Sequence, residues 1–130
     1  MSFMNRLANS SNRFQTPAKR VLCVCSAGLL RSPTTANVLH QEYGFNTRAA
    51  GIVKEYALIP VDEVLIEWAD EIVWVEQEKF DEGWEMFKDV LKHKKNVILD
   101  IPDIHQWNDP ELRVTIKKQY DDATIMEKAV

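Results

Sequence analysis

The sequence predicts an α/β protein in three layers: a doubly wound sheet of four parallel strands with helices on both faces. Four short apolar segments alternate along the chain with segments of helical periodicity. This alternation is typical of βαβ units, in which consecutive strands run parallel and the connecting helices cover the sheet. The length of 130 residues and the apolar fraction of 45% suit one domain with its own core.

The expected strands are short apolar runs, mostly rich in β-branched residues. They span residues 20–25, 47–52, 71–75 and 96–99. The expected helices span residues 32–43, 61–69 and 77–94, with a last helix from about Pro110. Pro33 suits the first turn of the first of these helices, and Gly44 suits its C-terminal stop. Asp109 suits the N-cap of the last helix.

Charge is distributed unevenly along the chain. The first 20 residues carry +4 and no acidic residue, from Arg6, Arg13, Lys19 and Arg20. Since the net charge is −4, the remaining 110 residues carry −8. We therefore expect residues 1–19 to be a basic N-terminal extension, either a solvated tail, a short extra helix or a transit peptide.

The composition also limits the partners of this chain. An acidic domain lacks the basic surface that phosphate backbones require, so we expect no nucleic-acid partner. No apolar run approaches the ~18 residues of a membrane-spanning helix, and no secretory signal is evident, so we expect no membrane partner and a cytoplasmic location.

The two cysteines, Cys23 and Cys25, are separated by one residue. This spacing fits neither a disulfide framework nor a zinc site, and the three histidines are scattered along the chain. We therefore expect no metal and no other cofactor. In a reducing compartment, a cysteine in a loop of unusual composition is a candidate nucleophile.

Ligands of doubly wound sheets bind beyond the carboxyl ends of the strands, which here singles out the loops after Cys25 and Leu99. The first loop has the form C-x5-R-S and consists of Cys25, Ser26, Ala27, Gly28, Leu29, Leu30, Arg31 and Ser32. A given chain of this composition contains that spacing by chance in roughly one case in a hundred. The alternative interpretation is a buried structural Cys25 and a surface Arg31.

Each part of the C-x5-R-S loop suits the cleavage of a phosphate ester. Consecutive backbone N–H groups between a strand and a helix can surround a phosphate, and Gly28 permits a left-handed backbone there. Arg31 can offer a bidentate fork to two phosphate oxygens, and its charge favours the thiolate form of Cys25, the form that attacks phosphorus. Ser32 can donate its hydroxyl to that thiolate or cap the following helix.

The segment VLCVCSAGLLRSPTTANVL resembles the N-terminal signature of the low-molecular-weight protein tyrosine phosphatase family. The later LDIPD and DPEL segments are similar to its short, predicted-phosphatase branch, and the resemblance covers about residues 20–122. It implies a four-stranded parallel sheet, with residues 20–130 as a phosphatase-like domain. It also implies that Cys25 is the nucleophile, that Arg31 binds phosphate and that Ser32 stabilises the thiolate.

The implied activity is hydrolysis of a phosphomonoester, either phosphotyrosine or a small phosphate ester, through a phosphocysteine intermediate. Two departures from the family pattern lie inside the loop. Ala27 and Gly28 occupy positions where the family commonly has Gly-Asn, so the Asn that braces the loop is missing. Leu30 occupies the position of a frequent second cysteine.

The leaving group of such a reaction needs a proton from a general acid. The family takes it from an aspartate in the loop after the fourth strand, where this chain has Asp100, Asp103 and Asp109. Asp103 matches the family best, because it follows Ile-Pro; Asp100 at the strand end is second, and Asp109 is third as a helix cap. All three residues could instead be turn and cap residues.

In this family, aromatic side chains form walls that hold the substrate ring. Tyr56 and Trp107 are candidates for that role, or for core packing.

Three other functions remain open. An arsenate reductase needs further cysteines after the nucleophile, and this chain has none after Cys25. In a phosphocarrier of the sugar-transport type, a loop cysteine holds a phosphoryl group for transfer. Such a carrier does not need a phosphate-binding arginine, so the presence of Arg31 distinguishes this chain from it. The third is a non-catalytic phosphate- or phosphopeptide-binding module, which the altered loop and the shifted acid suggest.

Overall fold

The computed structural model describes residues 18–26, 31–53, 55, 57, 59–101 and 109–128. Strands and helices alternate along this part of the chain, as the sequence predicts. Their order is β1 (Arg20–Cys25), α2 (Arg31–Tyr43), β2 (Asn46–Gly51), α3 (Glu63–Trp68), β3 (Glu71–Trp74), α4 (Gln77–Leu91), β4 (Lys95–Ile98) and α5 (Pro110–Lys128).

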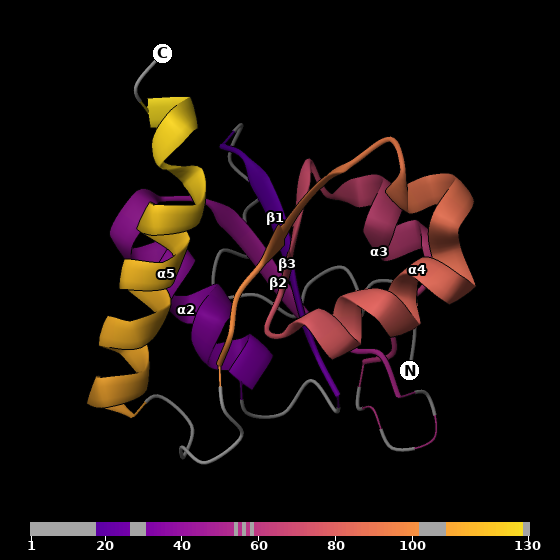
Figure 1. The fold of residues 1–130 in the computed structure, drawn as a ribbon, viewed down its shortest axis with the longest axis horizontal. Coiled ribbons are helices and arrows are strands. Elements are labelled where there is room, and N and C mark those ends of the chain that lie inside the picture. Colours follow the sequence, from indigo (N-terminus) through magenta and orange to yellow (C-terminus); the bar gives the residue numbers. More distant parts are fainter. Residues whose placement is uncertain are drawn as a thin grey trace.

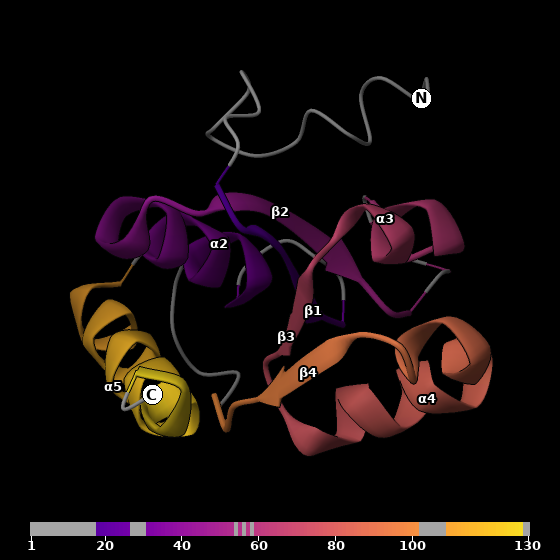
Figure 2. The same ribbon diagram turned by 90° about the horizontal axis from the view of Figure 1, so that it is seen from above.

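The four strands form one parallel sheet in the order β2-β1-β3-β4 (Figure 1). Figure 2 shows the sheet between two helical layers, with α2 and α5 on one face and α3 and α4 on the other. The predicted fold class, a three-layer, doubly wound α/β sheet, is thereby confirmed. The strand order reverses direction at β1, so the carboxyl end of this strand is a switch point at which such folds bind ligands.

Strand β1 contributes to both hydrophobic cores because its side chains alternate between the two faces. Its odd-numbered residues, Val21, Cys23 and Cys25, pack in the core beneath α2 and α5. Its even-numbered residues, Leu22 and Val24, pack in the core beneath α3 and α4. All five residues are buried, which explains why this strand is an uninterrupted apolar run in the sequence.

Helix boundaries follow local capping as well as hydrophobic periodicity. Helix α3 begins after Asp62, whose carboxylate accepts a hydrogen bond from the Leu65 amide at 2.9 Å. Asp109 precedes α5, and its Oδ1 accepts a hydrogen bond from the Glu111 amide at 3.0 Å. The predicted N-cap role of Asp109 is therefore confirmed.

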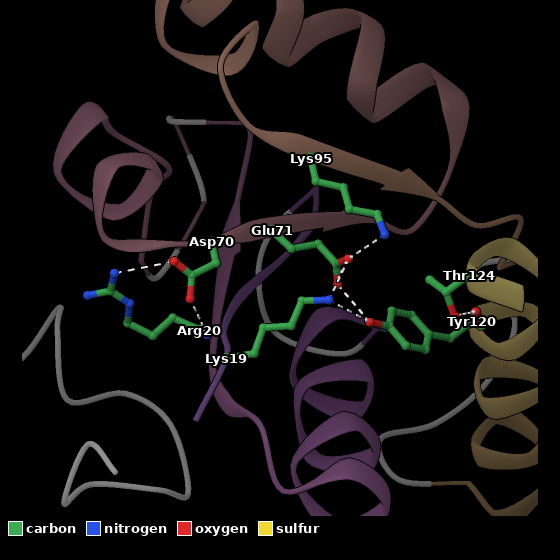
Figure 3. Close-up of polar contacts among 7 residues, drawn as sticks. All are labelled: Lys19, Arg20, Asp70, Glu71, Lys95, Tyr120 and Thr124. Carbon is green, nitrogen blue, oxygen red and sulfur yellow. Dashed lines mark hydrogen bonds and ion pairs between the residues drawn. The ribbon is translucent and has the colours of Figure 1, made fainter. Parts of the chain in front are cut away.

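A buried ionic cluster holds the amino end of the sheet, opposite the end where Cys25 lies. The carboxylate of Glu71 is inaccessible to solvent and lies 3.0 Å from Nζ of Lys19 and 3.6 Å from Nζ of Lys95. The Tyr120 hydroxyl donates to the same carboxylate at 2.8 Å (Figure 3). Burial, followed by the Glu71 charge, raises the pKa of Tyr120. Through Glu71 of β3, the cluster joins Lys19, Lys95 of β4 and Tyr120 of α5. Lys19 is the last residue of the expected N-terminal extension, so this residue contacts the domain.

Candidate active site

Cys25 ends β1, and its thiol lies beside the first turn of α2. The Sγ atom is 3.1 Å from Oγ of Ser32, with either atom able to donate. The Ser32 hydroxyl is also within hydrogen-bonding distance of the Ala50 carbonyl in β2, at 3.3 Å. Both side chains are almost wholly buried. Ser32 is the second residue of α2, inside the helix, so it contacts the thiol rather than capping the helix.

Backbone hydrogen bonds fix the start of the loop against the segment that follows β2. The Ile52 amide donates to the Cys25 carbonyl at 2.8 Å, and the Val53 amide donates to the Ser26 carbonyl at 3.0 Å. The rest of the loop, residues 27–30, lies outside the described residues. The expected phosphate-binding role of Ala27, Gly28, Leu29 and Leu30 therefore stays a prediction.

Arg31 is the first residue of α2 and has only 4% of its surface exposed. Its Nη1 donates to the carbonyl of Ile101 at 3.0 Å and lies 3.2 Å from Oε1 of Glu76. Ile101 follows β4 and Glu76 follows β3, so the guanidinium is held by residues from the carboxyl ends of two other strands. The structure therefore excludes the alternative in which Arg31 is a surface residue.

The three candidate acids have different positions. Asp100 is exposed, and its backbone exchanges two hydrogen bonds with the Gln119 side chain of α5, at 2.6 Å and 2.9 Å. It lines a surface pocket of about 530 Å³ between the carboxyl end of β4, the first residue of α4 and the second half of α5. Asp109 caps α5. Asp103 lies outside the described residues, as do the predicted aromatic walls, Tyr56 and Trp107.

Cys23 is the second thiol in this region, two residues before Cys25 and facing the same core. It is completely buried. Burial, with smaller contributions from Glu71 and Cys25, raises the pKa of the Cys23 thiol well above its ordinary value. Cys23 is therefore a neutral core residue, as its position inside a strand indicates.

Glu76 is the site residue that the sequence analysis missed. The signal was present in the sequence, because Glu76 directly follows the apolar segment predicted as a strand over residues 71–75. Ligands bind beyond the carboxyl ends of the strands in such folds, so the rule that selected the loops after Cys25 and Leu99 applies equally to this strand. Among the described residues, no group of three His, Cys, Asp or Glu side chains lies close enough to hold a metal ion. No described helix has the length and apolar character needed to cross a membrane.

No protein-family model matches this sequence, and no curated protein matches it. Solved structures do match the fold. The YwlE arginine phosphatase from Geobacillus stearothermophilus has 19% identity and a TM-score of 0.63, over 85% of this chain and 96% of that one. Vibrio vulnificus Wzb in complex with benzylphosphonate has 19% identity and a TM-score of 0.61, over 87% and 99% of the two chains.

A YwlE mutant from Bacillus subtilis has 16% identity and a TM-score of 0.64, over 85% of this chain and 99% of that one. All three are low-molecular-weight protein tyrosine phosphatases by fold. At these identities the likeness concerns the fold, and it confirms the fold that the sequence resemblance implied.

Proposed function

We propose that this protein is a phosphomonoester hydrolase of the protein-tyrosine-phosphatase-like kind, acting through a phosphocysteine intermediate. The observation that carries the proposal is the 3.1 Å contact between Cys25 Sγ and Ser32 Oγ beside the buried Arg31. A thiol at the carboxyl end of a central strand, in contact with a serine hydroxyl that is preceded in the chain by a buried arginine, has the kinds of residue that a nucleophilic thiolate needs around it. The fold is shared with phosphatases, which supports the same conclusion.

The reaction takes place in two steps. The Cys25 thiolate attacks phosphorus, an S–P bond forms, the P–O bond to the leaving group breaks, and the leaving oxygen takes a proton from the general acid. Water then attacks the phosphocysteine and gives a proton to the carboxylate of the same acid, the S–P bond breaks, and inorganic phosphate and the thiolate are released. Arg31 stabilises the charge on the phosphoryl oxygens in both steps, and Ser32 donates a hydrogen bond to the thiolate when it leaves phosphorus.

We propose that the loop from Ser26 to Leu30 supplies the backbone amides that bind the other phosphoryl oxygens. This role is supported by the hydrogen bonds that hold the start of the loop in place, because the Cys25 and Ser26 carbonyls both accept hydrogen bonds from the segment after β2. A loop of this length between a strand and the N-terminus of a helix is a favourable anion site.

We propose Asp103 as the general acid. Asp103 follows Ile101 by two residues, and two residues of chain span at most about 7 Å. Since the Ile101 carbonyl contacts Arg31, this proximity supports a role beside the phosphate. Asp100 is a weaker candidate because none of the residues lining its pocket is Cys25, Arg31 or Ser32. Asp109 already caps α5.

The substrate that we propose is phosphotyrosine or a small phosphate ester, with residues 20–130 as the catalytic domain. The benzylphosphonate bound to Wzb is an aromatic phosphonate, in keeping with an aryl phosphate substrate. We propose action in the cytoplasm, with no nucleic-acid or membrane partner and no cofactor.

The experiment that tests this function compares wild type and Cys25→Ser in the hydrolysis of p-nitrophenyl phosphate. Wild type should hydrolyse the ester, and Cys25→Ser should not, while its binding of phosphate or vanadate should largely survive because binding depends on the loop amides and Arg31. Binding without hydrolysis by wild type would favour the phosphate-binding module. Full activity of Cys25→Ser would exclude the phosphocysteine mechanism.

A further inference from the structure

Glu76 occupies the N-cap position of α4 without capping the helix. Its backbone is extended, and its carbonyl accepts the first helical hydrogen bonds, from the amides of Lys79 and Phe80. Its side chain makes no capping hydrogen bond. Ser, Thr, Asp and Asn are the residues that cap helices well, so the sequence gives up stabilisation at this helix end. Departures of this kind from a local rule are common at functional sites.

The Glu76 carboxylate is instead directed at the phosphate-binding arginine. Its Oε1 lies 3.2 Å from Nη1 of Arg31, whose side chain is 4% exposed, whereas that of Glu76 is 31% exposed. A guanidinium this deeply buried is costly without a counter-charge, and Glu76 supplies one. The second acceptor on the same nitrogen is the Ile101 carbonyl, at 3.0 Å.

We propose that Glu76 is the positioning residue for Arg31, fixing the guanidinium in the orientation that binds the phosphoryl group. This inference rests on the proposed phosphatase function and extends it to a residue outside the C-x5-R-S loop. An arginine side chain has four rotatable bonds, so restraining it before the ligand arrives reduces the entropy lost on binding. Glu76 provides that restraint from the end of β3.

The geometry favours positioning over competition with the phosphate. The contacts with Glu76 and with Ile101 engage Nη1. A fork formed by Nε and Nη2 can grip two oxygens of one phosphate on a different edge of the guanidinium. A carboxylate on Nη1 therefore braces the arginine at an edge that this fork does not use.

The test measures the Kd of inorganic phosphate by calorimetry, together with kcat for p-nitrophenyl phosphate. Glu76→Ala should weaken phosphate binding about tenfold, in the range of coupling energies between contacting residues, and should lower kcat. Glu76→Gln should recover part of this loss because its amide oxygen can still accept from Nη1. Glu78→Ala is the matched control, since the Glu78 carboxylate is 73% exposed and lies 3.6 Å from Lys79; it should change neither quantity.

A double variant separates positioning from a general loss of structure. If Glu76 acts through Arg31, adding Glu76→Ala to Arg31→Lys should weaken phosphate binding further by less than about twofold. An equal loss in both backgrounds, tighter phosphate binding by Glu76→Ala, or an unchanged Kd would each overturn the inference. If wild type binds phosphate with this dependence on Glu76 but hydrolyses no ester, the proposed function fails and the positioning role stands.

Discussion

The Sγ atom of Cys25 and the Oγ atom of Ser32 lie 3.1 Å apart, while the same Ser32 oxygen is 3.3 Å from the Ala50 carbonyl. A hydroxyl has one proton to donate. With a neutral thiol, Ser32 can donate to Ala50 and accept from Cys25. With a thiolate, the hydroxyl turns to donate to sulfur. The direction of this hydrogen bond therefore follows the charge state of Cys25.

Ser32→Ala should slow the hydrolysis of the phosphocysteine, because the hydroxyl that donates to the departing thiolate is lost. Hydrogen bonds to charged groups contribute about 1.5–3 kcal/mol, so this step should slow by roughly 10–100-fold. Phosphate binding, which depends on the loop amides and Arg31, should change little. The measurement is kcat for p-nitrophenyl phosphate together with the Kd of inorganic phosphate.

Thr35→Val is the control for Ser32→Ala. The Thr35 hydroxyl is buried in the first turns of the same helix, and it donates to the Arg31 carbonyl at 2.7 Å rather than to sulfur. Thr35→Val should leave kcat as in wild type. A wild-type kcat for Ser32→Ala would show that Ser32 does not stabilise the thiolate.

Peroxide should abolish the proposed hydrolytic activity in a way that dithiothreitol reverses poorly after long exposure. Oxidation of a reactive thiolate gives first a sulfenic acid, and without a resolving thiol it continues to irreversible products. Cys23 cannot resolve it, because burial raises the pKa of its thiol and keeps it neutral. The Cα atoms of alternate residues in a strand are also about 6.6 Å apart, near the upper limit of the separations that a disulfide spans.

The control for the peroxide experiment is Cys23→Ala. This variant should lose activity as wild type does, and its recovery in dithiothreitol should be as poor as that of wild type. The products are identified by mass spectrometry after timed exposure. Two results together would contradict the prediction. Wild type would form a Cys23–Cys25 disulfide and recover its activity completely, and Cys23→Ala would not recover.

The sequence was sufficient to predict the order of strands and helices because each depends on local patterns. The apolar run of β1 and the Asp109 cap are both visible in a few consecutive residues, and both are confirmed. Helix α4 was predicted to extend to residue 94 but ends at Leu91. The basic residues after it favour the end of a helix without fixing where the last turn stops.

The partners of Arg31 could not be predicted, because they come from chain segments far apart in the sequence. Glu76 and Ile101 are 45 and 70 residues away from it and meet it only once β3 and β4 are in place. The burial of Arg48 was missed for a related reason. A single arginine among small residues in a strand is expected at the surface, whereas the Arg48 side chain is buried beneath Trp68 of α3.

Arg48→Met should increase stability. Only 2% of Arg48 is exposed, and among the described residues its Nε and Nη1 have no hydrogen-bond partner. Burial lowers the pKa of Arg48 to about 10, so at neutral pH the folded state bears the full cost of the buried charge. The guanidinium lies 4.3 Å from the Trp68 ring centre. That contact contributes about 1–2 kcal/mol, less than the several kcal/mol that burying an unpaired charge costs.

The gain expected for Arg48→Met is roughly 1 kcal/mol, or a few degrees in melting temperature, measured by thermal and urea unfolding. The difference from wild type should shrink above about pH 10, as the guanidinium loses its proton in the folded state. Arg20→Met is the comparison, because Arg20 is half-exposed and paired with Asp70 at 3.3 Å. It should change stability by less than about 0.5 kcal/mol. A lower melting temperature for Arg48→Met would mean that the Trp68 contact outweighs the cost of burial.

Asp103→Asn should slow the hydrolysis of phosphotyrosine or phenyl phosphate by about 10²–10⁴-fold, the usual range for general acid catalysis. It should slow an ester with a low-pKa leaving group much less, because such a group departs without a proton. The measurement is kcat/KM across a series of aryl phosphates of increasing leaving-group pKa. The slope of the logarithm of kcat/KM against that pKa should be steeper for Asp103→Asn than for wild type.

Asp100→Asn and Asp109→Asn are the matched controls, and the structure separates their expected effects. Asp100 contacts Gln119 through its backbone, so an amide side chain leaves those hydrogen bonds in place, and neither stability nor the leaving-group slope should change much. Asp109→Asn retains an oxygen that can cap α5, so it should cost only a few tenths of a kcal/mol and leave the slope unchanged. If the steeper slope appears in Asp100→Asn and not in Asp103→Asn, the acid is at the end of β4, and the pocket that Asp100 lines becomes part of the active site.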